Sequence, residues 1–171
     1  MRVNHYNELL LRHVIDLVNT PPAGPDELAT RWNTVCTPPA TRVDATDLRT
    51  VRDYLARWTA LIDAPTEDAR VAHLNDLLAR YATPPTVSAH DGEGWHMHYR
   101  PEHARHSAIL TGATIVAAAQ YLTAHGMHRL GRCALPECPN AYADFSRPGR
   151  QRYCSHTCAN RDAVRRHRTR R

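Results

Sequence analysis

Residues 132–161 read RCALPECPNAYADFSRPGRQRYCSHTCANR and carry four of the five cysteines of the chain. These are Cys133, Cys138, Cys154 and Cys158, in the spacing C-x4-C-x15-C-x3-C. Two close thiol pairs separated by a loop let a short chain surround one tetrahedral zinc ion from both sides. A segment this short, with few apolar side chains, cannot close a hydrophobic core alone, so metal must supply folding energy. The spacing predicts one structural Zn²⁺ held by these four cysteines.

The residues around the cysteines predict a treble-clef-like zinc finger made of a knuckle, a hairpin and a helix. Residues 141–145 and 151–153 are expected to form the hairpin strands, because residues 146–150 (SRPGR) form a turn rich in proline and glycine. The helix is expected from about Thr157, with Cys158 in its first turn, where the positive helix end favours a thiolate. Protein ligands fill all four positions, which argues against an open catalytic coordination site.

Positive charge is concentrated in the same part of the chain. Residues 128–171 hold 11 arginines and three acidic residues, a net charge of +8, whereas residues 1–127 have a net charge of −3. Like charges so close together repel each other, and a polyanion would relieve that repulsion. We therefore expect a surface that binds the phosphates of double-stranded DNA. The candidate nucleic-acid-binding residues are Arg147, Arg150, Arg152, Asn160, Arg161, Arg165, Arg166, Arg168, Arg170 and Arg171.

The rest of the chain shows the apolar spacing of helices. Apolar stripes predict helices over 6–18, 26–35, 44–62 and 67–81, and a longer one from Pro101 to a left-handed cap at Gly126. Residues 86–90 and 95–100 flank the turn signal DGEG and predict a hairpin. The fold class is therefore mainly α: an N-terminal helical bundle with a small β-hairpin (residues 1–127), followed by the treble-clef-like zinc finger (residues 128–171).

No motif indicates catalysis, and we expect the protein not to be an enzyme. The chain lacks a glycine-rich phosphate loop, a nucleophile elbow and a metalloprotease His-Glu pair. A small metal-dependent nuclease built on His156, Asn160 and His167 is a weaker alternative. It is disfavoured because no carboxylate or histidine pair at hairpin spacing supplies an open site for a divalent ion.

The histidines and the cysteine outside the finger receive no functional role. His96 and His98 share a face of a predicted strand, and His103 and His106 share a face at the start of the long helix. A second metal or ligand site is the alternative to ordinary surface histidines. Cys36 stands alone and is expected to be a small buried apolar residue rather than a nucleophile.

The run from Cys154 to Arg161 resembles the CGNR zinc finger, named after a Cys-Gly-Asn-Arg signature. Here the signature reads Cys158-Ala159-Asn160-Arg161, with alanine in place of glycine, the replacement that best favours a helix. The resemblance implies that the four cysteines are the zinc ligands. It also makes Asn160 and Arg161 signature residues, which either contact DNA or brace the zinc site.

Residues 13–20, HVIDLVNT, resemble the opening motif of the ABATE domain, a mostly helical domain that precedes this finger. We expect Asn19 in this motif to be a helix C-terminal residue. Together the resemblances imply a bacterial, stress-related transcription regulator, in which the finger binds DNA and the N-terminal domain senses or assembles. No feature of the sequence indicates a small-molecule ligand for that domain.

Partners and localisation follow from the same features. A single finger would bind DNA weakly, so specific affinity is expected to need a homodimer, a second DNA contact from the N-terminal body, or RNA polymerase as a further partner. The alternative function is a basic protein-interaction module that binds an acidic partner or RNA polymerase. No apolar run approaches the roughly 20 residues of a membrane helix, and the start of the chain lacks a secretion signal. We expect a cytoplasmic, nucleoid-associated protein without membrane contact.

Overall fold

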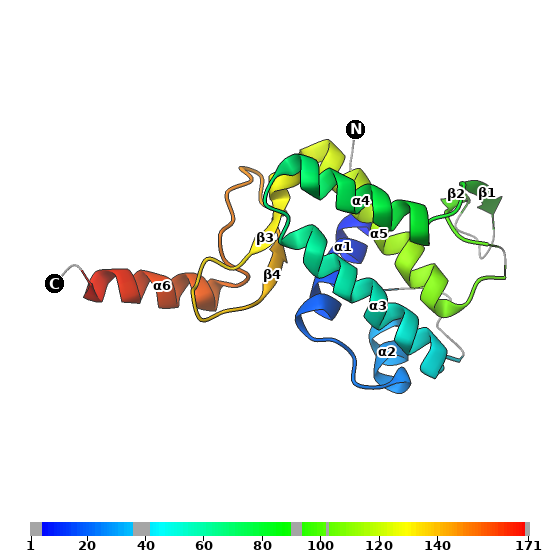
Figure 1. The fold of residues 1–171 in the computed structure, drawn as a ribbon, viewed down its shortest axis with the longest axis horizontal. Helices are drawn as coiled ribbons and strands as arrows, with labels where there is room; N and C mark the ends of the chain where they lie inside the picture. Colours follow the sequence, from blue (N-terminus) through cyan, green and yellow to red (C-terminus); the bar gives the residue numbers. More distant parts are fainter. Residues whose placement is uncertain (1–4, 36–41, 90–93, 102, 170–171) are drawn as a thin grey trace.

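The computed structural model describes residues 5–35, 42–89, 94–101 and 103–169. Cys36, Arg170, Arg171 and residues 91–93 of the predicted turn lie outside this range. The elements are α1 (His5–Asn19), α2 (Pro25–Trp32), α3 (Ala45–Ile62), α4 (Glu67–Tyr81), β1 (Thr86–Ala89), β2 (Trp95–His98), α5 (His106–His125), the 3₁₀-helix η1 (Met127–Arg129), β3 (Leu130–Arg132), β4 (Ala141–Ala143) and α6 (His156–Arg168). They confirm the predicted fold class. Helices α1–α5 form a bundle, with α6 projecting from one end and the β1–β2 hairpin at the other (Figure 1).

Helices α3 and α4 begin at capping residues that the sequence marks. The Asp44 carboxylate accepts hydrogen bonds from the backbone N–H groups of Thr46 and Asp47, and the Asp47 side chain accepts one from the Asp44 N–H. The Thr66 hydroxyl accepts a hydrogen bond from the Ala69 N–H. These bonds satisfy N–H groups that have no partner inside a helix, so both helices start where predicted.

Helix α5 begins at His106, not at Pro101, and its first turn is capped by a residue of another helix. The buried Asp47 carboxylate accepts hydrogen bonds from the Ser107 N–H (3.2 Å) and hydroxyl (2.7 Å). This cap lies 60 residues away in the sequence, so no local signal could place it. The prediction that His103 lies in this helix and shares a face with His106 is therefore wrong.

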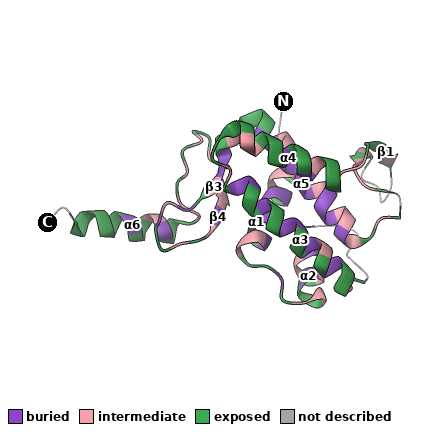
Figure 2. Cartoon of the chain, viewed as in Figure 1, coloured by how far each residue is buried: buried purple, intermediate pink, exposed green. Residues whose placement is uncertain are grey.

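Helix α5 is the centre of the bundle and packs against α1, α3 and α4. Purple, buried segments line the facing sides of these helices (Figure 2). Its Thr114 hydroxyl lies 2.7 Å from the Tyr54 hydroxyl of α3 in the core. By length and composition alone α5 is apolar enough to cross a membrane, although its sequence has no continuous apolar run. The core helices of soluble proteins share that property, and more than half of this helix is buried against its neighbours.

The hairpin at the base of the finger differs from the predicted one. Strand β4 pairs with β3, in the register Leu130↔Ala143 and Arg132↔Ala141, and not with residues 151–153. That third segment is held by a backbone hydrogen bond from the Ala134 N–H to the Arg152 carbonyl (2.7 Å) and by side chains. The Tyr142 hydroxyl donates to the Gln151 carbonyl (2.8 Å), and the Gln151 N–H donates to the Asp144 carboxylate (2.9 Å).

The β3–β4 hairpin belongs to the hydrophobic core of the bundle. Leu130, Ala141 and Ala143 are buried in the same cluster as the apolar faces of α1, α3, α4 and α5. The side-chain amide of Asn19, the last residue of α1, makes two hydrogen bonds to the backbone of Ala141. Asn19 Nδ2 donates to the carbonyl (3.0 Å), and Asn19 Oδ1 accepts from the N–H (2.7 Å). This amide occupies the free edge of β4 as a neighbouring strand would.

Two buried or half-buried arginines complete the attachment. Arg70 of α4 donates to the carbonyls of Ile62, at the end of α3, and Leu130, at the start of the finger. Arg129 donates to the carbonyls of Asp144 and Ser146, after β4. Because these bonds join backbone on both sides of the junction, the base of the finger is fixed against the bundle.

Replacing Asn19 with alanine is expected to lower the free energy of unfolding by about 1–2 kcal/mol, because the Ala141 N–H and carbonyl lose their partners. Urea unfolding followed by circular dichroism measures the change. Asn75→Ala, on the exposed side of α4, is the matched control and should change stability by less than about 0.5 kcal/mol. Equal losses in the two variants would contradict the bridging role of Asn19.

The contact between Arg105 and Asp44 predicts a pH dependence of stability. Hydrogen bonding from Arg105 and from the Asp47 N–H lowers the pKa of Asp44 from 3.8 to about 2. The stabilisation is therefore complete above pH 4–5 and is lost as the pH falls through the folded-state pKa. Asp44→Asn keeps the capping oxygen but loses the charge. The variant should be less stable than the wild-type protein at neutral pH, and the difference in unfolding free energy should shrink as the pH falls from about 4 to 2. A difference that does not change with pH would refute this account.

Candidate metal centre and arginine surface

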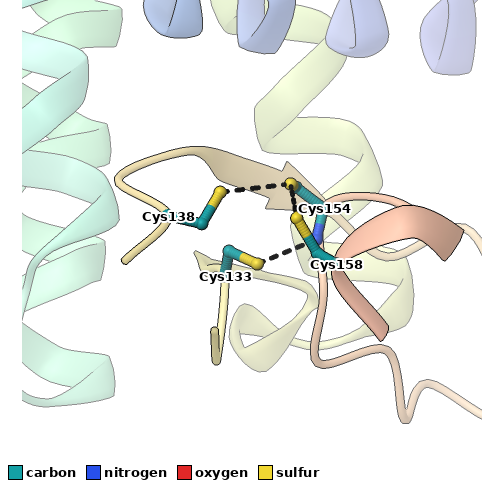
Figure 3. A group of neighbouring side chains, drawn as sticks. All are labelled: Cys133, Cys138, Cys154 and Cys158. Carbon is teal, nitrogen blue, oxygen red and sulfur yellow. Dashed lines mark hydrogen bonds between the residues drawn. The ribbon is translucent and has the colours of Figure 1, made fainter. Parts of the chain in front are cut away.

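The four finger cysteines converge from the knuckle and from the start of α6 (Figure 3). Their sulfur atoms all lie within 4.8 Å of one another. The Sγ atom of Cys154 is 3.6 Å from those of both Cys138 and Cys158. Four sulfurs bound at about 2.3 Å to one tetrahedral zinc ion lie roughly 3.8 Å apart. The cluster therefore fits the single structural zinc ion that the sequence predicts.

Hydrogen bonds from the backbone N–H groups of the cysteines help to position the thiols. The Cys133 N–H donates to the Asn140 carbonyl (2.8 Å), and the Cys138 N–H donates to the Leu135 carbonyl (2.9 Å), which closes the knuckle. Ser155 caps α6 by accepting from the Cys158 N–H (3.2 Å). Leu135 is fully buried beside the cysteines and is the main apolar side chain of the finger's own small core.

The pKa shifts of the thiols show why a cation is needed at this site. Burial, followed by contacts with the neighbouring thiols, raises the pKa of Cys154 to about 12. Burial also acts to raise the pKa of Cys133, but hydrogen bonds from the backbone of Cys154 and Leu135 outweigh it and lower the pKa overall. Four thiolates so close together require a positive ion between them. Metal affinity should therefore fall as the pH falls, because protons compete for the sulfurs.

The inner face of α6 is held by Asp162, a residue that sequence reasoning did not single out. The Tyr153 hydroxyl donates to its carboxylate (2.6 Å), and Arg165 and Arg166 form ion pairs with it at 2.5 and 2.9 Å. The Tyr153 hydrogen bond, followed by the bonds from Arg165, lowers the pKa of this buried carboxyl group. The sequence feature that could have identified Asp162 is its position as the one acidic residue among the arginines of the helix.

The structure places the described candidate residues for nucleic-acid binding at the surface. It brings four of them to one concave surface along α6, which encloses a volume of about 690 Å³. These four are Asn160, Arg161, Arg165 and Arg168. The remaining described candidates are exposed but do not line this surface; they are Arg147, Arg150, Arg152 and Arg166. Arg170 and Arg171 cannot be placed, since they lie outside the described residues.

The two signature residues have different surroundings. Asn160 is exposed, and its side chain makes no hydrogen bond within the described part of the chain. Arg161 instead donates to the Glu137 carboxylate of the knuckle, with 3.1 Å between Nη2 and Oε1. In the protein alone, Arg161 therefore ties α6 to the knuckle. The alternative of a second metal site made of histidines finds no support, because among residues 5–35, 42–89, 94–101 and 103–169 the cysteine cluster is the one group of three or more ligands suited to hold a metal.

The geometry of the cysteines agrees with the comparison to known families. Residues 129–171 match the CGNR zinc finger. The CGNR finger thus starts at the buried Arg129, at the junction with the bundle, and contains all four cysteines. No curated protein matches the chain. A zinc finger indicates a module that binds nucleic acid or protein; the division at residue 127 and the ABATE resemblance of residues 13–20 stay predictions.

Metal analysis of the purified protein is expected to give one zinc ion per chain. Cys158→Ser should abolish stoichiometric zinc and expose residues 133–168 to protease, because the finger has too few apolar side chains to fold without the ion. Cys36→Ser makes the same chemical change outside the cluster and should keep the zinc. Stoichiometric zinc in the Cys158 variant would exclude the four-cysteine site.

Proposed function

We propose that the protein is a DNA-binding transcription regulator that responds to stress. In this proposal the CGNR finger binds the phosphates of a DNA duplex, and the ABATE-like bundle senses a signal or assembles the protein. The proposal is supported above all by one observation: an arginine-rich helix projects from the bundle (Figure 1), and its base carries a cluster of four cysteines that fits a zinc ion. The role proposed is one of binding, without catalysis.

Helix α6 is anchored at one end and free along most of its length. Its buried residues are Cys158 and Asp162, both in the first two turns. Beyond them, Arg165, Arg166 and Arg168 are exposed, as are the three loop arginines Arg147, Arg150 and Arg152. Little of the surface of this helix packs against the rest of the protein. Its free sides are available to a partner.

The charge of this helix favours a polyanion as that partner. Residues 128–171 carry a net charge of +8, and the guanidinium fork of arginine matches phosphate oxygens in a bidentate geometry. Each arginine that meets a phosphate releases a condensed counterion, which gives affinity without sequence dependence. An α-helix also fits the width of the major groove of DNA.

The small size of the finger implies a second contact for specific binding. One finger-sized module buries less surface than a typical specific protein–DNA interface. A homodimer, or RNA polymerase bound beside the same DNA, would supply the missing contacts. Because Asn19, Arg70 and Arg129 fix the finger to the bundle, the bundle would set where each α6 lies in such an assembly.

Binding to duplex DNA is expected to weaken steeply with salt, since log K falls with log[salt] by about 0.9 for each phosphate neutralised. Arg150→Ala and Arg168→Ala should each reduce that slope by about one and weaken binding to all sequences. Arg49→Ala, on α3 in the bundle, removes the same charge far from α6 and should leave the slope unchanged. Fluorescence anisotropy with labelled duplexes at several salt concentrations measures all three.

Two outcomes would contradict the proposal. A binding constant that does not respond to salt would exclude phosphate contacts as the source of affinity. Competition by heparin as effective as competition by duplex DNA, with no preference for any duplex, would instead support the alternative of a basic module that binds acidic partners.

A further inference from the structure

The ion pair between Arg161 and Glu137 differs from the other ion pairs of α6. Arg165 and Arg166 share Asp162, which is buried under the helix and hydrogen-bonded to Tyr153. Glu137 is half-exposed and lines the concave surface together with Arg161. It therefore places a negative charge on a face whose other charged residues are arginines.

Both members of this pair lie close in sequence to cysteines of the cluster. Glu137 immediately precedes the ligand Cys138, and Arg161 follows the ligand Cys158 by three residues, on the next turn of α6. Their backbones are thus held on two sides of one rigid centre. The 3.1 Å contact between Nη2 and Oε1 then directs the arginine side chain toward the knuckle.

A restrained arginine beside a carboxylate is poorly suited to bind phosphate. A phosphate that approached Arg161 would also approach Glu137, and the repulsion between the two anions would cancel much of the attraction. The edge of a guanine base carries two neutral acceptors, O6 and N7, which match the arginine fork. The remaining N–H groups of the guanidinium can stay bonded to the carboxylate while the fork meets the base.

We propose that Arg161 recognises a guanine in the major groove and that Glu137 is the positioning residue that holds its guanidinium for this contact. The other arginines of the surface bind phosphates. This inference rests on the proposed function, because it requires that α6 binds duplex DNA. It assigns sequence preference to a pair of residues, one of which lies in the knuckle and outside the CGNR signature.

The test first uses the full-length, zinc-loaded protein to select preferred sites from a library of randomised duplexes. The affinity of each variant is then measured for the preferred site and for the same site with its guanine replaced. Arg161→Lys keeps the charge but loses the fork, so the preference for guanine should fall roughly tenfold or more while the salt slope stays the same. Glu137→Gln keeps the shape but loses the charge. It should lower the preference severalfold and strengthen binding to non-specific duplex.

Arg168→Ala is the matched control on the same concave surface. It should weaken binding to both duplexes equally and lower the salt slope by about one, as a phosphate contact does. Zinc content and circular dichroism confirm that each variant is folded.

The outcomes separate this inference from the proposed function. The inference would be overturned if Arg161→Lys kept the preference for guanine. It would also be overturned if Glu137→Gln bound DNA more tightly with an unchanged preference. Arg161 would then be a phosphate contact that Glu137 weakens. Duplex binding by the wild-type protein without any preferred site would overturn the inference as well, but would leave the proposed function standing. No binding to any duplex would overturn both.

Discussion

The clustering of four sulfur atoms at one point is the constraint on which the C-terminal part of the structure depends. The sulfur atoms of Cys133, Cys138, Cys154 and Cys158 all lie within 4.8 Å of one another, although 24 residues lie between the first and the last. The finger's own buried core is little more than these cysteines and Leu135. Such a core cannot offset the conformational entropy of the loops that it holds, whereas zinc–thiolate bonds can. The direction of α6 is therefore set by metal coordination.

The second constraint is that the base of the finger is packed into the bundle. Its first hairpin lies in the core of the bundle, and the Asn19 amide takes the place of a strand at the edge of β4. A half-buried arginine, Arg70, joins the end of α3 to the first strand of the finger. The two parts share buried apolar surface and buried polar bonds, so a change in the packing of α1 acts directly on β4. Under the proposed function, a signal sensed by the bundle would reach α6 through this junction.

Local patterns in the sequence predict most of the fold and the whole cysteine set. Capping residues such as Asp44 and Thr66, apolar periodicity and cysteine spacing each act over a few residues, so they are visible in the sequence. The features that were missed depend on contacts between distant residues. Asp47 caps α5 from 60 residues away, and Asn19 meets Ala141 from 122 residues away. The pairing of β4 with β3 was mistaken for the same reason, because periodicity identifies a strand but not its partner.

The acidic residues among the arginines show that charge count alone does not describe the surface. Sequence reasoning treated the arginines of the last helix as mutually repelling and in need of a polyanion. Asp162 already relieves part of that repulsion by pairing with Arg165 and Arg166, while Glu137 pairs with Arg161. The helix can therefore stay folded in the absence of a partner. Because Asp162 is buried and Glu137 is half-exposed, only the second of these carboxylates lies where it can influence what the arginines bind.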